Sequence, residues 1–191
     1  MIFGDKAVFA IESEITEFLE GNPFGRFLLW CNHHLIGDDE DNWVMIYACR
    51  NHLVEFITYS RLMPEVDGMT KEIVFERVYE PVYSEGFFRS SYEEWSRIGG
   101  DLRTGGDLCA CHHVEHLGMS SLMDRFQILL VESSNKEQRL IWRVVSSQEM
   151  YEGILPPQTF ETVAQQFIDW LDSEWQEYRA GLKTDTGYSS R

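Results

Sequence analysis

The sequence predicts an α+β fold, in which a mostly antiparallel sheet packs against two or more helices, including a long C-terminal helix. Two β-rich runs, residues 126–132 and 140–145, flank a polar segment, which is the pattern of a hairpin. A long amphipathic run follows from Pro156 onward. Strand and helix patterns do not alternate regularly, which disfavours a doubly wound parallel sheet. We expect a single domain over residues 1–181 and a frayed tail over residues 182–191.

Two strands are predicted near the N-terminus. Residues 7–15 alternate between apolar and polar side chains, with Phe9 and Ile11 on one side and Glu12 on the other. After a turn-prone Gly-Asn-Pro segment, residues 25–37 place apolar side chains on both faces. They predict a second strand, antiparallel to the first.

A run of four carboxylates, Asp38, Asp39, Glu40 and Asp41, stands directly before an apolar stretch. Such residues can cap a helix, and their charge is favourable beside the N-terminus of a helix. The pattern predicts a helix over about residues 42–59.

The last helix is expected to begin near residue 157, because proline fits the first helical turn. Its apolar side chains recur at helical spacing and form one stripe, at Phe160, Val163, Ala164, Phe167, Leu171 and Trp175. Gly181 is expected to end it. Neither the hairpin nor this helix can bury its apolar face alone, so we expect them to pack on each other.

The middle of the chain is more ambiguous. Residues 71–83 fit a strand and a helix about equally well, although Pro81 disfavours a central strand. Residues 86–106 form a long connection in which residues 92–98 fit a short helix. Residues 108–118 fit a further strand, which we expect to join the two hairpins in one sheet.

Composition restricts the partners and the location of the chain. The 32 acidic and 16 basic residues leave a formal net charge of −16. A field of this sign repels nucleic acid and anionic lipid and attracts basic partners, although it also serves simple solubility. No run approaches the roughly 20 apolar residues of a membrane span, and the N-terminus lacks a secretory pattern. Four irregularly spaced cysteines make a disulfide framework improbable, so we expect a cytoplasmic protein with reduced thiols.

One cluster could carry chemistry. Cys109, Cys111 and His113 are spaced by two and would share one face of a strand, where thiolate and imidazole could bind zinc. Ligands spaced in this way lie too far apart to reach one ion comfortably, and cysteine is often a small buried apolar residue. We therefore favour a structural strand, with His112 on its exposed face. The motifs of nucleophilic and metalloprotease catalysis are missing, so we expect no catalytic residue and no cofactor.

The N-terminal motifs resemble a known family. MIFGD at residues 1–5 is followed by FAIE at residues 9–12, and IGD at residues 36–38 ends a predicted strand with a helix behind it. This pattern resembles the immunity protein 42 family of bacterial polymorphic-toxin and contact-dependent inhibition systems. The resemblance implies a non-enzymatic protein that binds and blocks a cognate toxin domain.

Charge and resemblance together predict a basic toxin domain as the partner. A nuclease is one candidate, because domains that bind phosphates carry positive charge. Asp38, Asp39, Glu40 and Asp41 are the predicted contact residues, and the polar face of the last helix, with its own carboxylates, is the rival surface. The alternatives are a small metal-binding domain or enzyme centred on the cysteine and histidine cluster, and an acidic protein that mimics DNA.

Overall fold

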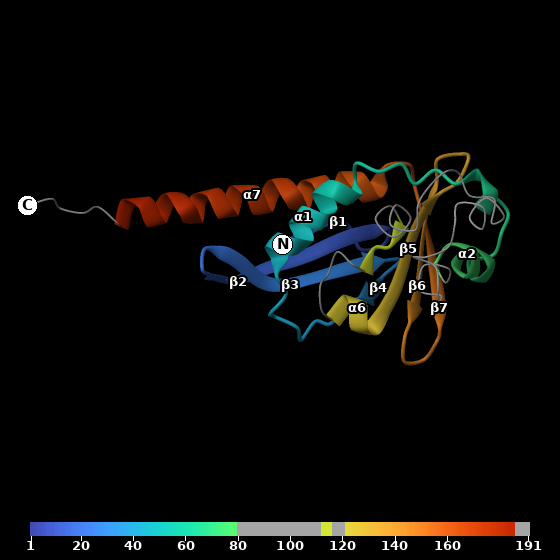
Figure 1. The fold of residues 1–191 in the computed structure, drawn as a ribbon, viewed down its shortest axis with the longest axis horizontal. Coiled ribbons are helices and arrows are strands. Elements are labelled where there is room, and N and C mark those ends of the chain that lie inside the picture. Colours follow the sequence, from blue (N-terminus) through green and yellow to red (C-terminus); the bar gives the residue numbers. More distant parts are fainter. Residues whose placement is uncertain (80–111, 116–120, 186–191) are drawn as a thin grey trace, which may run out of the picture.

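Two antiparallel sheets form the centre of the described part of the chain, which comprises residues 1–79, 112–115 and 121–185 of this computed structural model (Figure 1). The first sheet has the order β1-β2-β3-β4, with bounds β1 Ile2–Asp5, β2 Phe9–Leu19, β3 Asn22–Cys31 and β4 His34–Ile36. The second has the order β5-β6-β7, with bounds β5 Phe126–Glu132, β6 Gln138–Val144 and β7 Met150–Leu155. The α+β class and the C-terminal hairpin are confirmed, whereas the prediction of one combined sheet is wrong.

The N-terminal hairpin differs from its prediction at both ends. A short strand, β1, precedes the expected first strand and pairs with it at the sheet edge. The chain does not continue straight after Cys31, because Asn32 and His33 adopt φ angles of 50° and 64°. These left-handed conformations form a tight two-residue turn, which asparagine and histidine accept more readily than most residues. The prediction of one strand over residues 25–37 is therefore wrong, since β4 folds back on β3.

The acidic run does not start the first helix. Helix α1 spans Ile46–Phe56, so it begins later and ends earlier than predicted. Its N-cap is Met45, which makes no side-chain capping bond, and its first turn contains no acidic residue. Val44 instead forms two backbone hydrogen bonds with Gly25 of β3, with N to O distances of 2.8 and 3.0 Å. Pairing with a distant strand keeps the chain extended here, so the predicted capping role is wrong.

Helix α7 spans Thr159–Asp185 and runs along the first sheet, with its C-terminal end beyond the β2-β3 hairpin (Figure 1). The predicted stripe is confirmed, because all of it is buried except the half-buried Trp175. Gly181 does not end the helix. A glycine on an exposed face costs a helix only about 1 kcal/mol relative to alanine, which a long helix can tolerate. Residues 182–185 of the expected tail are therefore helical, and residues 186–191 lie outside the described residues.

Three shorter helices complete the described structure: η1 Pro64–Val66, a 3₁₀ turn, α2 Lys71–Val78 and α6 Ser121–Arg125. Helix α2 decides between the two alternatives for this segment, and Thr70 caps it by accepting the backbone N–H of Ile73. The predicted helix over residues 92–98 lies outside the described residues. Of the predicted strand over residues 108–118, residues 112–115 are described; they belong to no strand, and His113 forms an isolated bridge to Leu129.

The larger core lies where α1 and α7 cover one face of the first sheet. Phe9 stacks on Phe160 with ring centroids 5.1 Å apart, and Phe27 meets Phe167 edge to face at 5.3 Å. Helix α7 thus packs mainly on α1, β2 and β1, whereas the C-terminal hairpin, its predicted main partner, meets it at the first turn through Gln138. The two sheets approach closely at Gly153, where an added Cβ would lie 2.1 Å from the sulfur of Cys31.

A smaller core lies on the other side of the second sheet, where α2 packs. Its buried apolar residues are Val66, Val74, Phe75, Val78, Tyr79, Leu129, Val131 and Ile141. Strand β5 therefore buries side chains on both of its faces, which explains its nearly continuous apolar sequence.

Candidate functional site

The predicted contact residues form the connection between β4 and α1, and the structure divides them into two pairs. The carboxylate of Asp38 lies 2.5 Å from a guanidinium nitrogen of Arg125 and also accepts the backbone N–H of Glu40. The carboxylate of Asp41 accepts the backbone N–H two residues further on at 3.1 Å. Asp39 and Glu40 are exposed. The outer two residues thus shape the connection, and the middle two present their charge to solvent.

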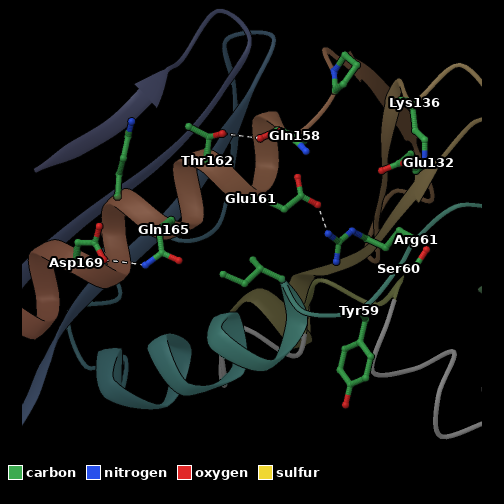
Figure 2. A pocket seen from close by; sticks show the side chains of 13 residues that line it. Tyr59, Ser60, Arg61, Glu132, Lys136, Gln158, Glu161, Thr162, Gln165 and Asp169 are labelled. Carbon is green, nitrogen blue, oxygen red and sulfur yellow. Dashed lines mark hydrogen bonds and ion pairs between the residues drawn. The ribbon is translucent and has the colours of Figure 1, made fainter.

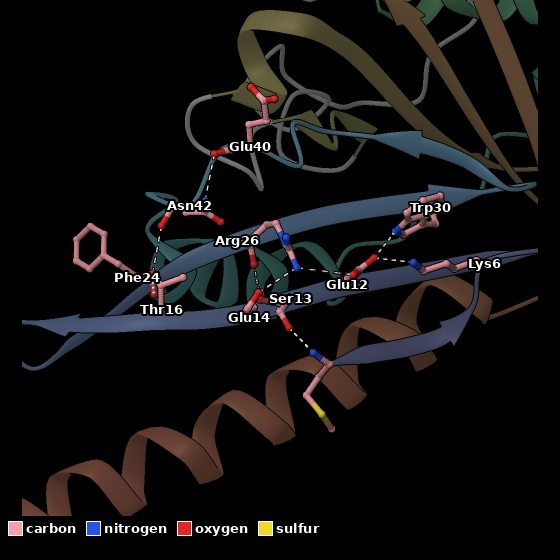
Figure 3. Close-up of polar contacts among 11 residues, drawn as sticks. Lys6, Glu12, Ser13, Glu14, Thr16, Phe24, Arg26, Trp30, Glu40 and Asn42 are labelled. Carbon is pink, nitrogen blue, oxygen red and sulfur yellow. Dashed lines mark hydrogen bonds and ion pairs between the residues drawn. The ribbon is translucent and has the colours of Figure 1, made fainter.

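Contacts with the first sheet hold residues 38–41, the acidic connection, in place (Figure 3). The hydroxyl of Thr16 lies 3.2 Å from the carbonyl oxygens of both Asn42 and Phe24. The side-chain amide of Asn42 donates to the carbonyl oxygen of Glu40 at 3.3 Å. The backbone pair of Val44 then closes the connection against β3. The acidic residues therefore sit on an ordered support.

A row of paired charges covers the neighbouring outer face of the first sheet (Figure 3). Glu12 accepts hydrogen bonds from the ammonium group of Lys6 at 2.6 Å and from the indole N–H of Trp30 at 2.9 Å. The hydrogen bond from Lys6 is the main reason that the pKa of Glu12 lies below its ordinary value. Arg26 pairs with Glu14 at 3.0 Å. These opposite charges offset one another, so this row attracts a basic partner less than Asp39 and Glu40 do.

The rival acidic surface, on α7, is partly engaged within the molecule. Both carboxylate oxygens of Asp172 contact the guanidinium of Arg50, at 2.9 and 2.7 Å. Asp169 accepts a hydrogen bond from the amide of Gln165 at 2.7 Å. Glu177 is exposed. The acidic connection therefore offers the more concentrated exposed charge.

A buried polar cluster contains the described part of the candidate metal ligands. The Nδ1 atom of His113 lies 3.3 Å from the carboxylate of Glu115, and the ring of Tyr79 stacks on the imidazole. Glu115 also accepts the hydroxyl of Tyr79 at 2.7 Å and the backbone N–H of Ile128 at 3.0 Å. Burial raises the pKa of Glu115, but the hydrogen bond and charge of His113 and the bond from Tyr79 together bring it below the ordinary value. The cluster ties this segment to β5 and α2.

The metal-binding alternative depends on residues that are only partly described. Cys109 and Cys111 lie outside the described residues. Among the described residues, no group of three or more potential ligands could hold a metal ion. The expected exposure of His112 is wrong, because this side chain is buried and its Nδ1 atom lies 2.9 Å from the carbonyl oxygen of Leu130.

A groove of about 890 Å³ lies beside the first turns of α7 (Figure 2). Beneath it, the guanidinium of Arg61 donates to the carboxylate of Glu161 and, at 2.6 Å, to the carbonyl oxygen of Phe56. Gln138 donates to Glu161 at 2.6 Å and accepts the backbone N–H of Phe160 at 2.9 Å, so it caps α7. Only 4% of the surface of Arg61 is exposed. This network joins α1, α7 and β6 and accounts for much of the polarity of the groove.

A family model for immunity protein 42 matches residues 1–170. The chain belongs to the immunity protein 42 family. Membership implies that the protein neutralises a cognate toxin, and immunity proteins are typically inhibitors without enzymatic activity. Comparisons with curated proteins and with solved structures each found no match. In the described part of the chain, no helix combines the length and the apolar character needed to cross a membrane.

The immunity protein 42 match extends well beyond the N-terminal motifs that carry the resemblance. It includes both sheets, α1, the acidic connection and the first turns of α7, and it ends within that helix.

Two features of this family member were not predicted from the sequence. The burial of Arg61 follows from no local sequence pattern, and Trp43 falls within the helix predicted over residues 42–59. The available signal is the position of Trp43, two residues after four consecutive carboxylates.

Proposed function

We propose that this immunity protein acts in the cytoplasm by binding a basic toxin domain of a polymorphic-toxin system in a stoichiometric complex. The match to the immunity protein 42 family carries the proposal. Asp39 and Glu40 are the main carboxylates through which the acidic connection attracts the toxin. Asp38 and Asp41 hold the connection in shape, through the bonds to Arg125 and to the following backbone.

Electrostatics supports a role in encounter more than in final affinity. The formal net charge of −16 creates an attractive field for a basic partner. Attraction between exposed charges is screened within about 8 Å at physiological ionic strength, so its main effect is on the association rate. A toxin that binds nucleic acid, such as a nuclease, would present the matching positive surface.

Growth protection and complex formation test the proposal. The probe is a candidate toxin domain taken from the reading frames that flank the one encoding this chain, expressed with and without the immunity protein in the same cells. We expect growth only when both are present, and an equimolar complex when both are purified. Growth arrest that persists in the presence of the immunity protein, together with no complex, would overturn the proposal.

Charge reversal tests the role of the acidic connection. Asp39→Lys combined with Glu40→Lys leaves the structural bonds of Asp38 and Asp41 in place. We expect the association rate at low salt to fall roughly tenfold and its salt dependence to weaken. The matched control reverses Glu55 and Glu76, which are exposed on α1 and α2. It changes the net charge equally, so an equal fall in both variants would show that only total charge matters.

A further inference from the structure

An exposed tryptophan stands beside the acidic connection. Trp43 exposes 64% of its surface, although its indole is among the largest apolar side chains a protein can bury. The ring of Phe24 lies edge-on to it, with ring centroids 6.2 Å apart. Tyr47 lies against Phe24 at 5.9 Å and leads to Trp175 at 6.2 Å. An aromatic row thus runs from the acidic connection across the start of α1 to α7.

The backbone fixes this row before any partner arrives. The N–H of Trp43 donates to the carboxylate of Asp41, and the next residue, Val44, is paired with β3. Phe24 lies on β3, and Tyr47 lies in the first turn of α1. Side chains held in this way lose little freedom on binding, which is the condition under which apolar contacts contribute most to affinity.

Carboxylates surround the row and define the chemistry of its occupant. Asp39 and Glu40 are exposed a few residues before Trp43, and Glu17, also exposed, lies directly opposite Phe24 in the β2-β3 pair. An aromatic face also attracts cations by itself. Within this row, the guanidinium of Arg179 already lies 4.4 Å from the ring of Trp175.

We infer that Phe24, Trp43 and Tyr47 form the apolar centre of the toxin-binding surface, with Asp39, Glu40 and Glu17 as its acidic rim. The inference rests on the proposed function and names the part of the surface that holds the toxin. The occupant is a basic protein surface that places arginine or lysine side chains beside an apolar recess for the indole of Trp43. Tryptophan, tyrosine and arginine at the centre of an interface supply most of its binding energy, while a charged rim governs encounter and excludes water.

The groove beside α7 offers the strongest competing surface, and its charges argue against it. It also contains an exposed aromatic residue, Tyr59, at 41% exposure. Of its carboxylates, Glu161 pairs with Arg61 and Glu132 pairs with Lys136 at 3.1 Å. The third, Asp169, accepts the amide of Gln165 at 2.7 Å. Its field is therefore largely balanced, whereas that of the aromatic row is not.

Truncation of Trp43 tests the inference. The probe is the toxin domain that passes the growth-protection test, purified in the complex, separated in denaturant and refolded. We expect Trp43→Ala to weaken binding at least about 30-fold, as truncation of a central anchor does. The loss should lie mainly in faster dissociation, unlike the slower association of the charge-reversed variant. The melting temperature should stay nearly unchanged because the indole is exposed, and Trp43→Phe should recover most of the affinity.

Tyr59→Ala is the matched control, because it removes an exposed aromatic side chain beyond the other end of α1. We expect it to bind as the wild type does, and cells that carry Trp43→Ala to need more immunity protein for the same protection. If the wild type binds the toxin and Trp43→Ala changes the affinity by less than threefold, this inference is overturned and the proposed function stands. A large loss for Tyr59→Ala alone would also overturn it and place the interface over the groove. Failure of the wild type to bind or to protect would overturn the proposed function and this inference with it.

Discussion

Removal of the Phe167 side chain should be among the most destabilising single truncations in the larger core. Phe167 is fully buried on α7, and its ring meets those of Phe3 at 5.9 Å, Phe27 at 5.3 Å and Trp170 at 6.0 Å. Two of these neighbours lie on β1 and β3, whose backbones are fixed by the sheet. The core can therefore collapse only partly into the space that alanine would leave.

We expect Phe167→Ala to lower the free energy of unfolding by about 3–5 kcal/mol, since both the transfer of the ring and the residual cavity contribute. At about 2–4 °C per kcal/mol for a chain of this size, the melting temperature should fall by roughly 6–20 °C. Urea unfolding followed by circular dichroism measures the change through the midpoint, and an unchanged slope would show that the unfolded state is unaffected.

The adjacent Gln166 supplies the control, because it is exposed on the same helix and alanine is at least as good a helix former. We expect Gln166→Ala to change the free energy of unfolding by less than about 0.5 kcal/mol. A loss below about 1 kcal/mol for Phe167→Ala would mean that the buried stripe of α7 has been assigned to the wrong face.

Three further predictions concern the buried titratable groups and metal content. The folded-state pKa of Glu115 lies below 4.5, so its ionised form stabilises the protein above that pH and loses this effect as the pH falls below it. Glu115→Gln should therefore lower the free energy of unfolding by about 1–3 kcal/mol at pH 7, and the difference from wild type should shrink in urea titrations below pH 4.5. Burial raises the pKa of Cys31 to about 12. Mass spectrometry should therefore find this thiol unmodified by iodoacetamide in the native protein at about pH 8 and modified in urea. Rapid labelling of the native protein would contradict the burial of Cys31. We interpret Cys109, Cys111 and His113 as structural, so elemental analysis should find no stoichiometric zinc. A content of about one zinc per chain, with loss of both the metal and stability on addition of a chelator, would contradict that interpretation.

Local periodicity was sufficient to predict the elements whose structure depends on a single packing or pairing partner. The spacing of Phe160, Phe167 and Leu171 is sufficient to define the buried face of α7, because any packing partner must cover that stripe. The hairpin around residues 133–137 was predictable for a similar reason, since two β-rich runs joined by a short polar segment pair with each other most cheaply.

The errors occurred where pairing between distant residues overrides local preference. The carboxylates before α1 are good helix-capping residues, yet the two backbone hydrogen bonds between Val44 and Gly25 hold the chain to β3 and delay the start of the helix. The same type of error applies to the strand predicted through His33, where a turn allows β4 to pair with β3. Local propensities of a few tenths of a kcal/mol per residue are outweighed by paired backbone hydrogen bonds to a strand of the sheet, each of which contributes about 0.5–1.5 kcal/mol.

The candidate site shows the same division. Its acidic character is visible in the sequence, but the sequence does not show that Asp38 is paired with Arg125 while Asp39 and Glu40 face solvent. Nor does it show that Trp43 is exposed beside Phe24, because burial depends on which elements approach from elsewhere in the chain.

The sequence by itself determined the α+β class, the amphipathic C-terminal helix, the acidic balance and the family resemblance, all of which depend on composition or on patterns of a few residues. Only the tertiary structure decided that there are two sheets in the described part of the chain, that the acidic connection forms a turn and does not begin a helix, and that Arg61, His113 and Glu115 are buried in polar networks. The reason is physical. The spacing of side chains along the sequence identifies which of them share one face of a helix or strand. Burial, charge pairing and exposure are set by partners that the fold brings from distant parts of the chain.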